Sequence, residues 1–182
     1  MQSFDKYIEL LKKVDMFTAS VVTAYQGQIS CGPGCDDCCR LTFTVFSVEA
    51  KNLRAGFDLL PQTRKDAILR RVAEHTEHSP CVLLEDGMCA LYHYRPVICR
   101  THGLPFTSEH IKVGGLNTMT LCEKNFKDDP DLAGVSEEHV LNLDVLNTTL
   151  AAINAFYMKE TGQGPGQERV WTHNIFAAAT AA

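Results

Sequence analysis

Apolar residues recur at steps of three and four along residues 4–25, which predicts an amphipathic helix ending near Gly27. The same period returns over residues 48–59, with Ser47 as its N-cap, then after Pro61, and again from about Ser136 to Tyr157. The positions that define the first helix are Phe4, Tyr7, Ile8, Leu11, Val14, Phe17, Val21 and Val22. The chain is therefore expected to be mainly helical.

Short β-elements are predicted between these helices. Residues 41–46 alternate in polarity and favour a strand, and Asp86-Gly87 lies between two apolar runs as in a two-residue hairpin, which would pair Glu85 with Met88. A second hairpin is expected around Gly114-Gly115, with residues 110–113 against 116–119. Pro96 is expected to open a short helix that runs to about His102 and ends at Gly103.

The length of 182 residues, 45% of them hydrophobic, is sufficient for one substantial core. We expect a single helical domain over residues 1–161, with a cysteine-rich core at 31–122. A glycine-rich break and an apolar tail form residues 162–182. The tail carries Trp171, Ile175 and Phe176, and could dock on its own core, on a second copy in a homodimer or on another protein partner.

Charge narrows the choice of partners. The net charge is -5, and no run of Lys or Arg is interleaved with aromatic residues, which argues against nucleic acid and anionic membranes as partners. The first residues have scattered charges rather than the apolar run of a signal peptide, and no later stretch has membrane-spanning length. A cytoplasmic protein is expected, in a reducing compartment where thiols stay reduced.

Eight cysteines lie at or near predicted turns, hairpins or helix starts rather than inside the long helices. Four come within nine residues, and Gly32, Pro33 and Gly34 between them bend the backbone so that sulfurs can converge. The distribution favours metal ligands over buried apolar spacers, although an even number also fits a disulfide framework. The predicted metal ligands are Cys31, Cys35, Cys38, Cys39, Cys81, Cys89, Cys99 and Cys122.

The spacing leaves the metal open between tetrahedral zinc and iron, including a [4Fe-4S] cluster, because all are held by thiolates with short spacers. Cys38 and Cys39 are adjacent, and neighbouring side chains rarely reach the same small ion. The eight thiols could form two four-ligand sites, one polynuclear site with spare thiols, or one site plus a redox pair that includes Cys38 or Cys39.

Basic residues stand next to the cysteines and could compensate the negative charge of bound thiolates. They are Arg40, Arg95 and Arg100, and Tyr92 is expected to pack or hydrogen-bond beside the same site. The helix start at Pro96 would add backbone N–H groups and a positive dipole end. These four residues are the predicted supporting shell around the ligands.

The combined pattern resembles a known family. Cys35-Asp-Asp-Cys38-Cys39-Arg40, followed by Cys81-x7-Cys89-x2-Tyr92-x2-Arg95-Pro96-x2-Cys99-Arg100, is similar to the YkgJ-type CxxCxxCC family of zinc- or iron-chelating domain proteins. The resemblance covers residues 31–105 and implies metal chelation. Cys31 departs from the family spacing, and Cys122 lies outside the core motif. The Tyr–Arg-Pro–Cys part is also similar to flagellin lysine N-methylases, which are longer chains that carry an iron–sulfur cluster.

The leading interpretation is a protein that chelates zinc or iron through clustered cysteines. A second interpretation is an enzyme in which an iron–sulfur cluster supports redox or methyl-transfer chemistry on a protein substrate. A third is a thiol–disulfide redox protein. No nucleophile–base pair or phosphate-binding loop stands out, so no catalytic residue is assigned.

Overall fold

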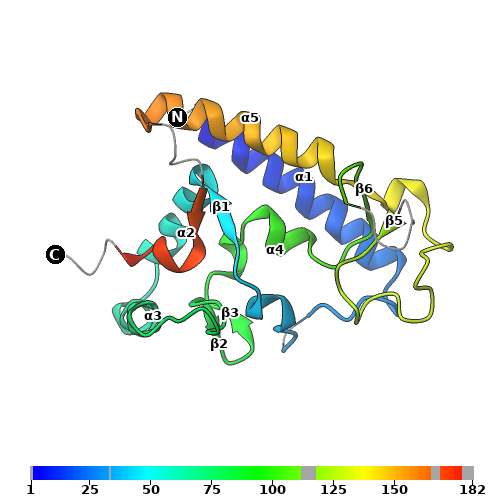
Figure 1. Cartoon of the computed structure of the whole chain (residues 1–182), viewed down its shortest axis with the longest axis horizontal. Helices are drawn as coiled ribbons and strands as arrows, with labels where there is room; N and C mark the ends of the chain where they lie inside the picture. The colour runs from blue at the N-terminus through cyan, green and yellow to red at the C-terminus, as the bar shows by residue number, and fades with distance from the viewer. Residues whose placement is uncertain (1, 33, 112–117, 165–168, 178–182) are drawn as a thin grey trace. The chain divides into compact units, whose positions relative to one another are not determined.

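The computed structural model describes residues 2–32, 34–111, 118–164 and 169–177 (Figure 1). Pro33, Gly114, Gly115 and the last residues of the tail lie outside them. Within the described residues the α-helices are α1 (Gln2–Ala24), α2 (Ser47–Asp58), α3 (Gln62–Ala73), α4 (Val97–Thr101) and α5 (Leu143–Thr161). The mainly helical architecture with small strand pairs is confirmed.

In the part of the chain that the structure describes, the strands are short and pair in three small sheets. They are β1 (Thr44–Phe46), β2 (Leu84–Glu85), β3 (Met88–Cys89), β4 (Phe106–Thr107), β5 (Thr118–Met119), β6 (Leu141–Asn142) and β7 (Arg169–Trp171). Single 3-10 turns are η1 (Asp37–Arg40), η2 (Tyr92–Tyr94), η3 (Glu137–His139) and η4 (Thr172–Asn174). The chain divides into two compact units. Unit 1 holds residues 33–96 and 154–182 with Met1, and unit 2 holds residues 2–32 and 97–153.

The C-terminal tail docks within unit 1. β7 pairs antiparallel with β1, Val45 opposite Val170, as the red and cyan strands in Figure 1 show. Phe176 is fully buried, and its ring centroid lies 4.8 Å from that of Phe57. Of the three docking sites expected for the tail, the structure therefore shows docking on the core of the same chain. That core is formed by Val45, Leu53, Phe57, Ile68, Val82, Leu83, Leu91, Ile175 and Phe176.

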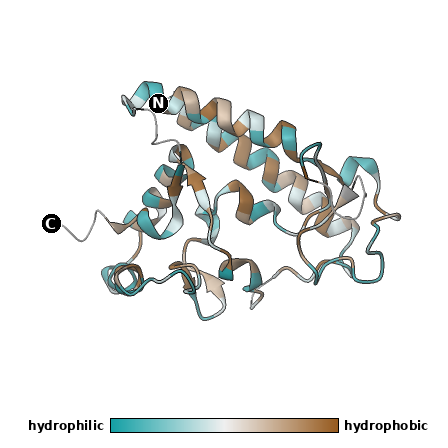
Figure 2. Ribbon diagram, viewed as in Figure 1, coloured by the Kyte–Doolittle hydropathy of each residue, from teal (hydrophilic) through white to brown (hydrophobic). Residues whose placement is uncertain are grey.

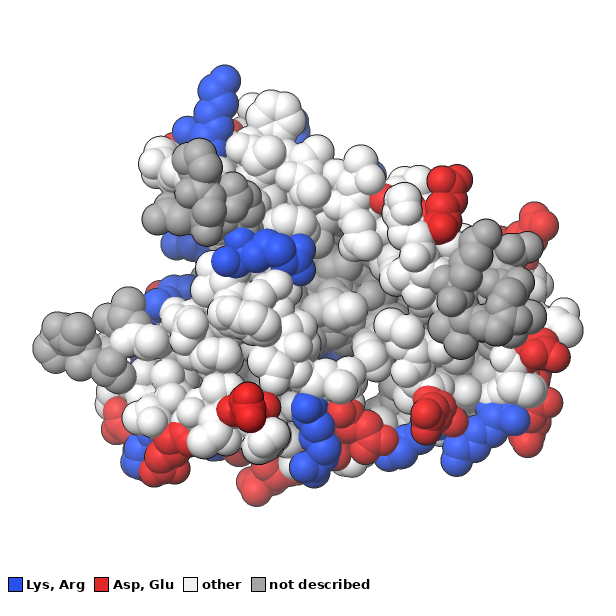
Figure 3. Space-filling model, viewed as in Figure 1, with Lys and Arg blue, Asp and Glu red and all other residues white. Residues whose placement is uncertain are grey.

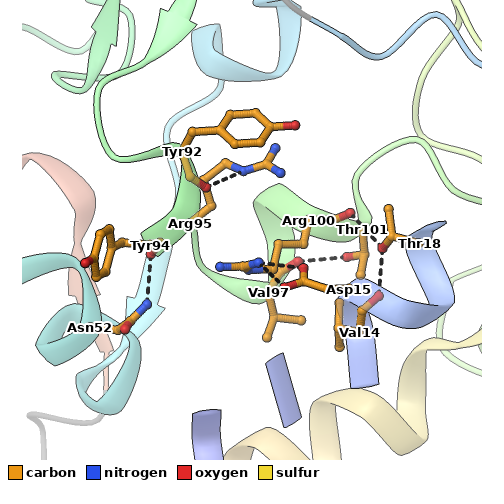
Figure 4. Close-up of polar contacts among 10 residues, drawn as sticks. All are labelled: Val14, Asp15, Thr18, Asn52, Tyr92, Tyr94, Arg95, Val97, Arg100 and Thr101. Atoms are coloured by element: carbon orange, nitrogen blue, oxygen red, sulfur yellow. Dashed lines mark hydrogen bonds and ion pairs between the residues drawn. The ribbon is translucent and has the colours of Figure 1, made fainter. Parts of the chain in front are cut away.

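The start of α2 differs from the expectation for Ser47. Ser47 is the first helical residue, and Phe46 occupies the N-cap position. A carboxylate oxygen of Glu49 accepts the Phe46 amide at 2.9 Å, so Glu49 provides the side-chain cap that was expected from Ser47. Further along α2, the Asn52 amide donates to the Tyr94 carbonyl at 3.1 Å, which anchors η2 (Figure 4).

Unit 2 is organised around α1. The helix buries the predicted positions Tyr7, Leu11, Val14 and Val21, and α4 packs against it. Figure 2 shows apolar and polar residues alternating around α1, as an amphipathic helix requires. Gly103 ends the α4 segment with a φ of +84°, a left-handed conformation that suits glycine and confirms the predicted stop.

The second predicted hairpin is wrong in register. Met119 pairs with Phe106, and Thr118 pairs with Thr107, whereas His110 and Ile111 belong to no strand. The hydroxyl of Ser108 accepts both the His110 and the Ile111 amides, at 3.1 and 3.2 Å, and this turn ends β4 at Thr107. The predicted turn at Gly114-Gly115 lies outside the described residues.

The last long helix starts later than its apolar period predicts. Residues after Ser136 form η3 and then β6, which pairs in parallel with β4, Leu141 opposite Phe106. α5 begins at Leu143, where the Asn142 side chain accepts the Val145 amide at 3.0 Å. The pairing of β6 with β4 and the cap at Asn142 therefore start α5 later than the apolar pattern alone predicts.

Two surface properties bear on partners. Among the described helices, none has the length and apolar content needed to cross a bilayer. On the face drawn in Figure 3, basic and acidic side chains are interspersed rather than gathered into one large patch of a single sign.

Candidate metal centre

The eight predicted ligands divide between the two units. Unit 1 contains five of them, and unit 2 contains Cys31, Cys99 and Cys122. The five in unit 1 are Cys35, Cys38, Cys39, Cys81 and Cys89.

In unit 1 the two halves of the motif meet. The amide of Cys81 donates to the carbonyl of Cys39 at 2.7 Å, although 41 intervening residues separate them in sequence. A Cβ placed on Gly87 would lie 3.4 Å from the Cα of Gly34, so the tip of the β2–β3 hairpin contacts the first cysteine loop. We call Cys38, Cys39, Cys81 and Cys89 the four-cysteine group.

The β2–β3 hairpin has the predicted geometry. Asp86 and Gly87 have φ values of 50° and 75°, as a two-residue primed turn requires, and Glu85 pairs with Met88. Leu84 is opposite Cys89, and Val82 and Leu83, next to Cys81, are 2% and 4% exposed. Burial of these two side chains fixes the backbone on which Cys81 is mounted.

The thiols of the four-cysteine group are half-buried and affect one another's protonation. The hydrogen bond with Cys39, followed by burial, raises the pKa of Cys38 far above its usual range. Burial raises the pKa of Cys81 to about 11 and also raises the pKa of Cys89. Negative charge on Cys38 would oppose ionisation of both Cys81 and Cys89. These raised pKa values favour the protonated thiols of Cys38, Cys81 and Cys89 at neutral pH when no metal is bound.

Three arginines of unit 1 oppose these shifts. Arg95 favours the thiolates of Cys38 and Cys89, and its guanidinium carbon lies 3.6 Å from the ring centroid of Tyr92 (Figure 4). Arg64 and Arg71, both on α3, act on Cys89 and Cys81 respectively. Neither α3 residue was predicted. Arg71 follows the buried Ile68 by three positions, so an inward-facing arginine could have been recognised from the helical period.

The other two predicted arginines pair with acids. Arg40, whose side chain is 63% exposed, bonds Asp36 at 3.0 Å. Arg100, whose side chain is 6% exposed, donates to both carboxylate oxygens of Asp15 at 2.5 and 2.7 Å (Figure 4). The Arg100 pair joins α4 to α1 within unit 2, and the hydroxyl of Thr18 also bonds the Arg100 carbonyl.

In unit 2, Cys31 and Cys122 approach each other at Gly103. A Cβ placed on Gly103 would lie 2.8 Å from the Cβ of Cys122 and 3.6 Å from the sulfur of Cys31. Asn125, which is 3% exposed, donates to the Cys31 sulfur at 3.5 Å and to the Gly103 carbonyl at 2.8 Å. Its side-chain oxygen accepts the Ser30 amide at 2.9 Å. Asn125 was not predicted, because asparagine at a turn carries no distinctive sequence signal.

Replacing Asn125 by alanine is expected to destabilise the chain by about 1–3 kcal/mol, because the Ser30 amide and the Gly103 carbonyl lose a buried partner. Urea unfolding of the full chain measures the loss. Asn147→Ala is the matched control, since Asn147 is exposed on α5 and its replacement should stay within about 0.5 kcal/mol. Equal stability of the two variants would contradict the linking role of Asn125.

The types of ligand in the four-cysteine group suit a thiophilic metal, but the present arrangement of their side chains does not enclose an ion. Among the described residues, no group of three or more His, Cys, Asp or Glu side chains converges closely enough to hold an ion. The backbone contact between Cys39 and Cys81 nevertheless brings soft thiol ligands of both motif halves together, with positive charge beside them. A metal ion at this group would require the cysteine sulfurs to converge more closely than they do in this structure.

Comparison with known proteins agrees with this donor chemistry. A family model named CxxCxxCC, described as a putative zinc- or iron-chelating domain, matches residues 30–124, more than half of the chain. The match includes all eight cysteines. Searches of curated proteins and of solved structures gave no match. On the strength of the family match, the chain belongs to the CxxCxxCC family, and metal chelation is the activity that this family description supports.

Proposed function

We propose that the protein binds zinc or iron through thiolates of the four-cysteine group, with Cys38 as the central ligand. The observation that carries the proposal is the Cys39–Cys81 backbone contact, which unites two cysteine segments that are distant in sequence. Cys38 is central because its charge is coupled to Cys39, Cys81 and Cys89. A centre of this kind joins the loop at residues 34–39 to the β2–β3 hairpin.

The protein residues have distinct tasks in such a site. The thiols must lose their protons to bind, so binding releases protons, and Arg95 offsets part of the resulting negative charge. Val82 and Leu83 hold the Cys81 backbone in the core, and the Arg64–Glu85 ion pair at 2.6 Å holds the hairpin against α3. A bound zinc would supply cross-linking of these segments, and a bound iron centre would add redox chemistry.

The remaining cysteines extend the proposal. Cys35 is a further candidate ligand within unit 1, and Cys31, Cys99 and Cys122 are candidate ligands of a second centre within unit 2. Two metal ions per chain would indicate two sites, whereas iron together with acid-labile sulfide would indicate a cluster. Support for the extension comes from the approach of Cys31 to Cys122 at Gly103.

The experiment is anaerobic purification of the full chain, followed by metal analysis and a visible spectrum. We expect at least one zinc or iron per chain, colourless with zinc and brown with an iron–sulfur cluster. A folded, metal-free protein that does not take up either metal when reduced would contradict the proposal. Loss of all eight thiols in that protein would identify disulfides instead.

A second function, thiol–disulfide chemistry, is favoured by the hydrogen bond between Cys38 and Cys39. In that reaction the two thiols give two electrons and two protons to a small disulfide such as oxidised glutathione, which becomes two thiols. Thiol counting on the metal-free chain, before and after exposure to oxidised glutathione, tests it. Unchanged counts exclude this second function.

A further inference from the structure

Arg71 on α3 has an unusual environment for a cation. Its Nε donates to the carbonyl of Val82 at 2.8 Å, which places the guanidinium at the residue next to Cys81. Its Nη2 is buried and has no hydrogen-bond acceptor in the part of the chain that the structure describes. No carboxylate of the described residues forms a salt bridge with it.

The other arginines near the four-cysteine group are compensated in other ways. Arg64 bonds Glu85 through both Nε and Nη2, at 3.0 and 2.6 Å. Arg95 stacks on Tyr92, whose side chain is half exposed, and donates to the Tyr92 carbonyl at 3.0 Å. A partly buried cation with a buried, unused donor lowers the stability of the folded state unless an anion compensates it. None of the carboxylates that the structure describes supplies that anion to Arg71.

A loaded thiolate site would supply the missing negative charge. Three or four thiolates around a divalent ion carry a net charge of about one or two minus, and the Arg71 guanidinium is held at Val82, the residue next to Cys81. We propose that Arg71 is the counter-cation of the metal–thiolate centre, a positioning residue whose partly buried charge favours the metal-loaded state over the metal-free state. This inference rests on the proposed function. It adds a reason why the metal-loaded state is favoured over the metal-free state.

We expect substitution of Arg71 to weaken metal binding without lowering the stability of the metal-free chain. Arg71→Gln removes the charge but retains an amide donor for the Val82 carbonyl, so affinity for metal should fall by about 10-fold, within the range for residues that support ligands. The metal-free chain should be equally stable or more stable, because an uncompensated, partly buried charge is gone. Arg71→Lys keeps the charge and should recover most of the affinity.

Arg70→Gln is the matched control. Arg70 immediately precedes Arg71 on α3, and its side chain is exposed to solvent. Its replacement removes one positive charge from the same turn of the helix and should change metal affinity by less than about threefold, because solvent screens an exposed charge.

The experiment titrates the reduced, metal-free full chains with Co²⁺ against a competing chelator, following the thiolate-to-cobalt charge-transfer absorption, and unfolds the metal-free chains in urea. Weaker Co²⁺ binding by Arg71→Gln, undiminished metal-free stability and rescue by Arg71→Lys support the inference. Unchanged affinity overturns it while leaving metal binding intact. Parallel loss of affinity and metal-free stability, without rescue by lysine, also overturns it, because Arg71 would then be only structural. Absence of the absorption in the wild-type chain overturns the metal site itself.

Discussion

A Cys38→Ser chain is expected to lose at least about 100-fold in affinity for zinc or ferrous iron, the largest effect of any single substitution considered. A neutral hydroxyl replaces the thiolate of the proposed central ligand, and soft sulfur ligands bind these metals far better than a serine hydroxyl does. Even residues that only support ligands are worth 10–100-fold in affinity, so loss of a ligand should exceed that range. Competition with a chelator on reduced chains measures the change.

Met88→Leu is the matched control for Cys38→Ser. Met88 is 53% exposed and immediately precedes Cys89, so the variant removes an adjacent sulfur without removing a thiolate. Its affinity should equal that of the wild-type chain. The metal-free Cys38→Ser chain should also unfold at the wild-type urea midpoint, because the Cys38 side chain is only half-buried. Equal affinities for Cys38→Ser and Met88→Leu would remove Cys38 from the ligand set.

Removal of the metal is expected to loosen residues 31–105 more than the flanking helices. Cys38 and Cys39 lie on one turn of 3-10 helix, Cys89 lies on a two-residue strand, and Cys81 lies in neither a helix nor a strand, so the segments that carry the group form few hydrogen bonds of their own. α1, with 23 residues, and α5, with 19, contain no cysteine and are held by their own backbone hydrogen bonds and by their buried faces. Metal binding therefore contributes a larger share of the stability around the site.

Hydrogen exchange with and without chelator measures this difference. At free metal about 100-fold above its dissociation constant, linkage stabilises the bound segments by about 2.7 kcal/mol, which corresponds to about 100-fold slower exchange. Amides of residues 37–40 and 81–90 should show the change, and central amides of α1 should show little. Equal protection in both states would contradict a structural role for the metal.

Local chemistry made some elements predictable. Asp86-Gly87 fixed the β2–β3 hairpin and its register, because few residue pairs adopt two consecutive positive φ values. The period of three and four identified α1 and its buried residues, and Gly103 marked the end of the α4 segment. The cysteine spacing identified the family that the family model then matched.

Long-range pairing was not predictable in the same way. β7 pairs with β1 across more than 120 residues, and β6 pairs with β4 in parallel, and neither contact leaves a local signal. Long-range pairing also explains the late start of α5, because β6 contains residues that the apolar pattern assigns to the helix. In the site, Arg71 and Asn125 were missed because their roles depend on burial beside distant segments.

Metal coordination by Cys38 can be measured by X-ray absorption at the metal edge of the loaded wild-type chain and of the loaded Cys38→Ser chain. We expect a first shell dominated by sulfur at about 2.3 Å, the usual zinc–thiolate distance, with one fewer sulfur around any metal that Cys38→Ser retains. A first shell of nitrogen and oxygen alone, or an identical sulfur count in the two chains, would contradict coordination by Cys38.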